Sequence, residues 1–389
     1  MAHGKPIYLD HAASTPLDAA VTDAVMRVLA CTGSPDALHP SGGSAAALLE
    51  NARAQVAALI GADPDEVIFT AGATEARNLA VKGLLSANRA RGRHAVASVV
   101  EHPAVLSALH SRQREGHEVS FVGVDRDGYI SPETLAAAMT ADTALVSVHH
   151  AQHEIGTIQD LGGLISAVRG RRAEARIHID AAESAGIIEI DVGDLGADAL
   201  TMGGTALGAP PWSGALWVRP GARLHPLIEG GSQEFGKRAG PVDLAGAVAL
   251  GVAANRVRTR LATRAAKRRR QIELLAARVL GIADVRLNGP ALADRLPGHL
   301  QVSVRGVTGE SLALALATRG VEVSPGSTCT ADAGKASPTL EAIGRDSVWT
   351  HSAILMTIGD ATTDEELRRA AAVLASVVAD LRAMSPLDA

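Results

Sequence analysis

The segment Phe69-Thr70-Ala71-Gly72-Ala73-Thr74-Glu75-Ala76 has the pattern of a strand, a turn of small residues and the start of a helix. Thr74 has a side chain suited to cap that helix, and the N–H groups beside it suit a phosphate group. Junctions of this kind are common in α/β proteins, so the segment indicates the fold class. To assign a phosphate-binding site here, further evidence from other parts of the chain is needed.

Short apolar runs alternate with amphipathic segments on both sides of this junction, which predicts an α/β fold with a largely parallel sheet. Seven segments are expected to be its strands: Val67–Thr70, His94–Val99, Val119–Val122, Leu145–His149, Arg176–Asp180, Ala199–Met202 and Ala215–Val218. The apolar stripe of residues 45–60 predicts one of the helices between them.

The C-terminal third has a different pattern, which predicts a smaller α+β domain. It is expected to begin with one long helix, Arg256–Leu280. The strands Val285–Leu287, Leu300–Val304 and Val321–Ser324 and a closing helix, Asp364–Arg382, should follow. We therefore expect a large domain of residues 15–255 and a small domain of residues 1–14 and 256–389.

Composition excludes several classes of function. The 389 residues carry a net charge of −5 from 37 basic and 42 acidic side chains, so no nucleic-acid-binding surface is indicated. No apolar run approaches the ~18 residues that a membrane helix needs. The start of the chain has no apolar leader, and two cysteines cannot build a disulfide framework. These features predict a cytoplasmic protein that binds neither nucleic acid nor membrane.

A series of short motifs follows in a fixed order along almost the whole chain. The motifs are Tyr8-Leu9-Asp10-His11, the Gly72-Ala73-Thr74-Glu75 turn, Glu101-His102-Pro103, His153-Glu154-Ile155-Gly156, His178-Ile179-Asp180-Ala181-Ala182, Gly309-Glu310-Ser311-Leu312 and Gly326-Ser327-Thr328-Cys329-Thr330. This series closely resembles the cysteine desulfurases of the class V aminotransferase group.

The resemblance implies a fold type I pyridoxal-phosphate (PLP) enzyme, with a mixed, mostly parallel seven-stranded sheet, working as a homodimer. It implies that Asp180 pairs with the pyridine nitrogen of the cofactor and that His102 stacks on the ring. Thr74 would lie at the phosphate. Cys329 would be the cysteine on a loop that attacks substrate sulfur and becomes a persulfide.

The chain departs from the family where the cofactor should be attached. The family has Ser-x-His-Lys after the strand that follows the aspartate, and its lysine forms the internal aldimine. Residues 214–218 match the next strand without a gap, so Ala206 takes the lysine position. Gly203 and Thr205 take the positions of the serine and the histidine. Covalent attachment of PLP at Ala206 is therefore impossible.

Further positions around the expected site also differ from the family. Leu355 replaces the arginine that binds the substrate carboxylate, which removes a bidentate donor. Glu183 replaces a glutamine near the phenolic oxygen, Gln152-His153 replaces an asparagine pair, and Pro241 replaces a threonine lent across the dimer. Three lost phosphate contacts, at ~1.5–3 kcal/mol each, would weaken cofactor binding by several orders of magnitude.

Four hypotheses follow from this pattern. The first is a non-canonical sulfur-handling protein in which Cys329 relays a persulfide between a donor and an acceptor protein. The second is a scaffold, a pseudoenzyme that pairs with an active desulfurase, and a pocket filled by Leu207, Trp212 and Leu355 would favour it. The third is an active enzyme that holds PLP non-covalently, with His102 or His153 as base.

The fourth hypothesis is a metal site around His102, His153, Asp180 and Glu183, beside the histidine-rich segment His149-His150. The alternative is that these residues form no metal site, because neighbouring strand residues face opposite sides of the sheet and only some of them point inward. Lys237 remains one further possibility for the missing amine, since its Gly-rich loop matches one that reaches the partner's active site in the family. Cys329 and His102 are the catalytic candidates, and no metal ligand is assigned.

Overall fold

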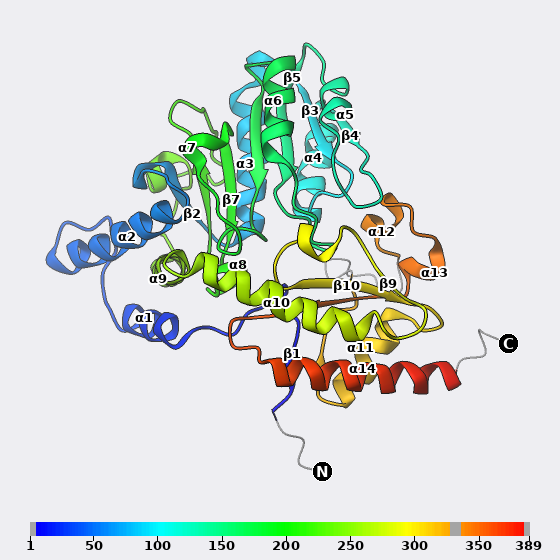
Figure 1. Ribbon diagram of the computed structural model, residues 1–389. Coiled ribbons are helices and arrows are strands. Elements are labelled where there is room, and N and C mark those ends of the chain that lie inside the picture. Colours follow the sequence, from blue (N-terminus) through cyan, green and yellow to red (C-terminus); the bar gives the residue numbers. More distant parts are fainter. Residues whose placement is uncertain (1–4, 327–335, 385–389) are drawn as a thin grey trace.

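The computed structural model describes residues 5–326 and 336–384. Its largest sheet has seven strands in the order β2-β8-β7-β6-β5-β3-β4 (Figure 1). The strands are β2 (Val67–Thr70), β3 (His94–Ser98), β4 (Glu118–Val122), β5 (Thr143–His149), β6 (Arg176–Asp180), β7 (Ala199–Gly203) and β8 (Gly214–Val218). All seven predicted strands are present, with ends shifted by at most two residues.

The sheet is mixed and mostly parallel, as predicted. Strands β4, β3, β5, β6 and β7 run parallel to one another, and β8 is antiparallel to both β7 and β2. The register brings Asp180, at the end of β6, opposite His149 on β5 and Thr201 on β7. The carboxyl ends of these parallel strands therefore meet at one edge, where ligands collect in open α/β sheets.

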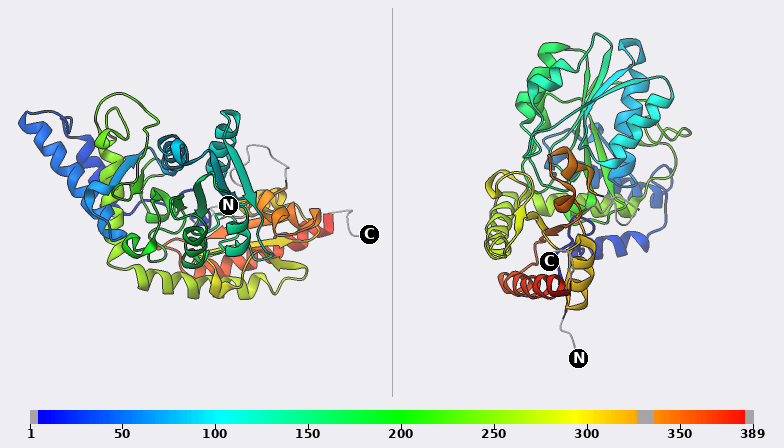
Figure 2. Two further views of the ribbon diagram at one scale, coloured as in Figure 1. Left: turned by 90° about the horizontal axis from the view of Figure 1, so that it is seen from above. Right: turned by 90° about the vertical axis from the view of Figure 1, so that its right-hand side faces the viewer.

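Helices cover both faces of the sheet, as the right-hand view of Figure 2 shows. The helices of this layer are α1 (Ala19–Leu29), α2 (Pro40–Leu59), α3 (Ala73–Ala87), α4 (Pro103–Arg114), α5 (Pro132–Ala137), α6 (Leu161–Arg171), α7 (Val192–Leu195), α8 (Gly204–Leu207) and α9 (Leu244–Arg258). One face packs against α3 and α4, and the other against a core that includes α2, α6 and α9. Burial on both faces explains why the strands are apolar along their whole length.

A second, smaller layer follows. Strand β10 (His299–Val304) pairs antiparallel with β9 (Val285–Leu287) and β12 (Ala353–Thr357), and β11 (Val321–Glu322) pairs parallel with β1 (Ile7–Tyr8). Its helices are α10 (Leu261–Val279), α11 (Gly309–Thr318), α12 (Pro338–Ala342), α13 (Ser347–Thr350) and α14 (Asp364–Met384). Apart from α12 and α13, these elements share a separate apolar core, and Leu340 of α12 packs instead in a small cluster with Ile155. The domain boundaries proposed from the sequence stay a prediction.

The predicted helix Arg256–Leu280 is wrong as a single element. Helix α9 ends at Arg258, α10 begins at Leu261, and Arg260 between them has a non-helical backbone (φ −130°, ψ 9°). The two helices serve different cores: α9 packs so closely on α2 that a Cβ on Gly251 would lie 2.6 Å from the Ala52 Cα, whereas α10 packs on the smaller sheet. One straight helix could not fill both cores.

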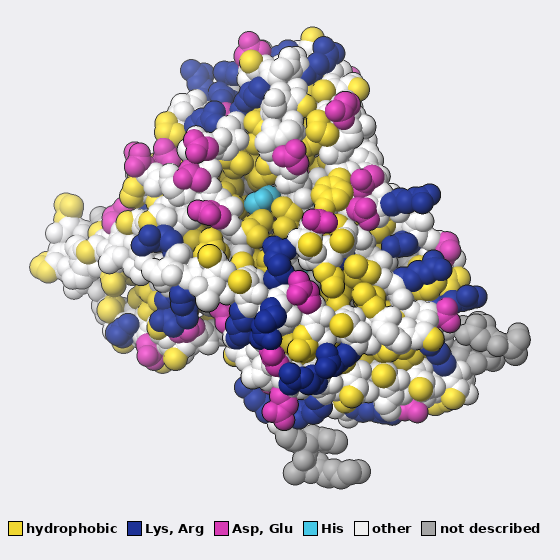
Figure 3. All heavy atoms as spheres, viewed as in Figure 1, with side chains coloured by type: hydrophobic (Ala, Val, Ile, Leu, Met, Phe, Trp, Pro, Cys, Tyr) yellow, Lys and Arg dark blue, Asp and Glu magenta, His cyan; other side chains and the backbone are white. Residues whose placement is uncertain are grey.

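The face of the molecule seen in Figure 3 shows no dominant patch of one charge. Figure 3 shows basic side chains gathered over α10, with acidic side chains next to them. Several of these charges are paired, as in the 2.7 Å contact between Arg270 and Asp364. In the described part of the chain, no helix has the length and apolar character needed to cross a membrane.

Candidate functional site

A polar cavity of about 370 Å³ lies at the carboxyl edge of the large sheet. Its walls come from the turn before α3, the loops after β3, β5 and β6, and the start of α8. The lining residues are Ala12, Ala13, Ala71, Gly72, Ala73, Thr74, Arg77, His102, His153, Ala182, Glu183, Gly203, Gly204, Thr205 and Pro211. Four of the predicted site residues, Thr74, His102, Glu183 and Thr205, thus meet in one place.

The turn before α3 gives the cavity its first wall. Gly72 precedes the helix with φ +84°, and a Cβ at this position would lie 2.8 Å from the Pro211 carbonyl oxygen, so only glycine fits. Helix α3 begins at Ala73, so the sequence-based assignment of Thr74 as the capping residue is wrong. Thr74 lies inside the first turn and lines the cavity instead.

A buried ion pair lies behind the cavity wall. The Asp180 Oδ2 accepts a hydrogen bond from the Arg77 Nε at 2.6 Å, and Asp180 Oδ1 accepts one from the backbone N–H of Ala182 at 3.2 Å. The two side chains are only 4% and 3% exposed. Burial alone would raise the pKa of Asp180, but the Arg77 guanidinium outweighs it and holds that pKa at about 2. Asp180 is therefore an anion with a partner inside the protein.

Glu183 is a second carboxyl group near the same guanidinium. Its Oε1 lies 3.7 Å from the Arg77 Nη2, and its side chain is 25% exposed. Burial in the cavity wall raises the pKa of Glu183 to about 7, although Arg77 opposes the shift. Near neutral pH this carboxyl group is thus partly protonated and can either donate or accept a hydrogen bond.

Two histidine rings also line the cavity. The His102 Nδ1 accepts a hydrogen bond from the Ala104 backbone N–H at 3.0 Å, and the centroids of the His102 and His153 rings are 5.0 Å apart. Burial, and secondarily the charge of Arg77, lowers the pKa of His102 to about 3. Burial also lowers the pKa of His153 well below its usual range. Both imidazoles are neutral at neutral pH and are weak bases.

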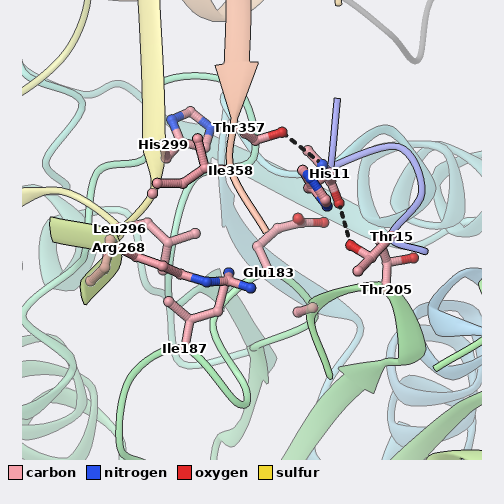
Figure 4. Close-up of a pocket in the computed structure, with 14 residues that line it drawn as sticks. His11, Thr15, Glu183, Ile187, Thr205, Arg268, Leu296, His299, Thr357 and Ile358 are labelled. Atoms are coloured by element: carbon pink, nitrogen blue, oxygen red, sulfur yellow. Dashed lines mark hydrogen bonds between the residues drawn. The ribbon is translucent and has the colours of Figure 1, made fainter. Parts of the chain in front are cut away.

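A smaller cavity of about 30 Å³ adjoins this site where the two layers meet (Figure 4). Thr205, Ala206 and Glu183 line it from the large layer, and His11, His299 and Arg268 are among the residues that line it from the other side. Ala206 lies on the one-turn helix α8, and its carbonyl oxygen accepts a hydrogen bond from the Arg264 Nη2 at 3.1 Å. Ala206 lines this smaller cavity together with Glu183 and Thr205, which also line the large one.

The described lysines lie elsewhere. The Lys237 Nζ is 5.9 Å from the centroid of the Phe235 ring, and the Lys267 Nζ donates to the Asp360 carbonyl oxygen at 2.6 Å. Lys5 is exposed, and Lys82 lies in α3. Within residues 5–326 and 336–384, no lysine lines either cavity.

The large cavity is not filled by the three bulky residues whose presence there would favour a scaffold. Leu207 belongs to the core of the large layer, Trp212 is 57% exposed, and Leu355 is buried in β12 opposite Gln301. None of the three lines the cavity. Cys329, the sulfur-handling candidate, falls outside the described residues.

The histidine-rich segment does not converge on the cavity. The His149 Nδ1 lies 2.8 Å from the Glu101 Oε1, and the His150 Nδ1 lies 3.0 Å from the Ser184 Oγ. Among the described residues, no group of three His, Cys, Asp or Glu side chains is placed to hold a metal ion.

Arg77 is the site residue that sequence reasoning missed. It lies on the buried side of α3 together with Ala76, Ala80 and Leu84. A guanidinium in the middle of an apolar helical stripe was the available signal, because a buried charge needs a partner. The sequence could not name that partner, since Asp180 is 103 residues away.

Comparison with known proteins identifies the family of the chain. The pattern of the family described as aminotransferase class-V matches residues 7–369. The chain is similar to the cysteine desulfurase IscS of Dictyoglomus turgidum, with 37% identity over 385 residues that cover 98% of this chain and 97% of the relative. It is equally similar to IscS 1 of Archaeoglobus fulgidus, at 37% identity over 98% of this chain and 99% of the relative.

Solved structures agree with this result. A structure described as a NifS-like protein matches with a TM-score of 0.91 and 27% identity, covering 96% of this chain and 100% of the other. DndA from Streptomyces lividans matches with a TM-score of 0.75 and 29% identity, covering 90% and 99%. The polar cavity at the carboxyl edge of this sheet is therefore that of a member of the class V aminotransferase family with cysteine desulfurases among its relatives.

Proposed function

We propose that this chain is a cysteine-desulfurase-like pseudoenzyme with a degenerate PLP site, which handles sulfur as a persulfide on Cys329. The observation that carries the proposal is Ala206, a methyl group on α8 that lines the smaller cavity, next to Thr205, which lines both cavities. The family is PLP-dependent and its chemistry uses a lysine amine. That no lysine of the described residues lines either cavity supports the loss of ordinary desulfurase catalysis.

The remaining side chains do not suit the cofactor either. Both oxygens of Asp180 already have donors, Arg77 and the Ala182 N–H, so the carboxylate expected to pair with a ring nitrogen is engaged. Leu355 is buried within a sheet and offers no charge to a substrate carboxylate. These features support a cavity that has lost the function of its relatives, and we derive no reaction step through PLP.

Two alternatives have less support. An enzyme that used His102 or His153 as base with non-covalent PLP would depend on imidazoles whose pKa values are held far below neutrality. A pure scaffold has no need of a polar cavity, and here the cavity remains open. The combination of an open cavity with a lost amine favours a role in which sulfur moves without PLP.

The proposed reaction is an exchange between persulfide and thiolate. The Cys329 thiolate attacks the outer sulfur of a persulfide on a donor protein, the S–S bond of the donor breaks, and the donor cysteine leaves as a thiolate. One sulfur atom is transferred and no oxidant or reductant is required. We propose that the chain does this as a cytoplasmic homodimer, with an acceptor protein that takes the sulfur from Cys329.

Mass spectrometry after incubation with a small-molecule persulfide tests this function. The wild-type chain should gain one sulfur atom on the peptide that contains Cys329, and the Cys329→Ser variant should not. Cys31→Ser is the matched control, because Cys31 is exposed and is the other cysteine of the chain. Equal sulfur loading of the wild type and Cys329→Ser would refute the proposal.

An absorbance spectrum with and without added PLP tests the degenerate site separately. The purified protein should be colourless and should lose added PLP on dialysis. A yellow protein would overturn the proposal. If the colour disappeared in the Lys237→Ala variant, the amine would come from Lys237, supplied by a second copy of the chain.

A further inference from the structure

The position of Arg77 suggests more than the loss of an old site. Its helix begins at the cavity, and Arg77 lies one turn inside, on the side of α3 that is buried against the sheet. The side chain crosses to the end of β6 and lines the cavity on its way. A cation is therefore fixed between the cavity and the carboxylate of Asp180.

This cation competes with any ligand that would use Asp180. A protonated ring nitrogen in the cavity would have to displace the Arg77 Nε from a 2.6 Å contact inside the protein. The protonated nitrogen would also come close to the positive charge of Arg77. The displaced guanidinium would have only Glu183 nearby, and at 3.7 Å this carboxyl group cannot hold it as tightly as Asp180 does. Breaking one side of a buried pair is strongly unfavourable.

We propose that Arg77 determines which ligands this cavity accepts, because it supplies a built-in counter-ion to Asp180 and so excludes rings held by a protonated nitrogen. The ligand class that fits is a small polar molecule whose ring, if it has one, is uncharged. The inference rests on the proposed loss of PLP chemistry and gives a second cause for it, independent of Ala206.

A double-mutant cycle of Arg77 and Asp180, with the dissociation constant of PLP as the measured quantity, tests this role. Arg77→Gln leaves Asp180 without its cation, so PLP should bind about tenfold or more tightly than to the wild type. In the Asp180→Asn background the same change should alter the affinity by less than about twofold, because no carboxylate remains for the ring nitrogen. Equilibrium dialysis gives these dissociation constants without relying on activity.

A deaza analogue of PLP, in which carbon replaces the ring nitrogen, separates charge from shape. The wild type should bind PLP and the analogue with similar affinity, and Arg77→Gln should gain affinity for PLP alone. Arg53→Gln is the matched control, because Arg53 forms an equally buried pair with Glu234 away from both central cavities. That variant should leave both affinities unchanged.

Each outcome decides the question. A gain for both ligands would mean that Arg77 only blocks space, and no gain for either would mean that it does not control entry; both overturn the proposal. If Arg77→Gln is unfolded alone, PLP should restore its melting transition and the deaza analogue should not. Failure of that rescue would also overturn it. Sulfur loading of Cys329 is unaffected by these results, so the proposed function stands or falls separately.

Discussion

The chain contains two buried arginine–carboxylate pairs that look alike but differ in their surroundings. Arg53 and Glu234 make two parallel hydrogen bonds of 2.8 Å, and Glu234 also accepts one from the Phe69 N–H at 2.7 Å. Arg77 donates from its Nε to Asp180 at 2.6 Å, beside the polar cavity. The first pair has the bidentate geometry of a structural clamp, although both of its members line a separate cavity of about 180 Å³. In the second pair Arg77 lines the polar cavity and Asp180 lies behind it.

The backbone around the first pair supports this distinction. Glu234 and Phe235 have positive φ values of 49° and 57°, which are unfavourable for residues other than glycine. The clamp to Arg53 and β2 holds the loop in that conformation. No comparable strain accompanies Asp180, which ends a regular strand. The difference suggests that the Arg53 pair serves stability and that the Arg77 pair serves the cavity.

The largest effect is expected from Glu234→Gln. It removes the buried anion of Arg53 and leaves only the largely exposed Glu50 beside the guanidinium, so the free energy of unfolding should fall by about 3–5 kcal/mol. Urea denaturation measures this change. Glu50→Gln is the control: Glu50 also contacts Arg53 but is 59% exposed, so its loss should cost less than about 1 kcal/mol. Equal losses would remove the distinction between clamp and surface pair.

A smaller effect is expected from Asp180→Asn. Water in the cavity can solvate the released Arg77, so the loss at neutral pH should be about 1–3 kcal/mol. The pKa of Asp180 in the folded protein is about 2, below its ordinary value of 3.8, so its stabilisation is complete above pH 3.8 and disappears as the pH falls towards 2. Urea midpoints of wild type and variant should therefore converge over that range. A loss as large as that of Glu234→Gln would show that both pairs are structural.

The smallest effect concerns Glu183, whose pKa is shifted the other way. Its pKa is raised from 4.5 to about 7, so the folded state prefers the protonated form and stability should decline as the pH rises from 4.5 to 7. The shift corresponds to about 3 kcal/mol, which contact with solvent at the 25% exposed side chain reduces. Glu183→Gln should therefore remove a decline of about 1–2 kcal/mol. The check is the pH dependence of the melting temperature in wild type and variant. If the two melting-temperature curves ran parallel, burial would not be raising the pKa of Glu183.

Much of the fold could be predicted because local patterns and tertiary structure agree. Apolar runs bounded by turns predicted every strand of the large sheet, since such runs are buried on both faces in a parallel sheet. The break at Arg260 could not be predicted, because the residues on both sides favour a helix and only the two separate cores require a bend. The position of Thr74 was predicted wrongly because the helix already starts at Ala73, directly after Gly72 with its positive φ.

For the site, the sequence by itself determined which chemical groups exist: a methyl group at position 206, a leucine at position 355, and a carboxylate at the end of β6. Only the tertiary structure decided that this carboxylate is already neutralised by Arg77 and that the cavity in front of it stays open. The physical reason is that charge pairing and cavity volume depend on distances between side chains far apart in the chain. No local pattern contains those distances.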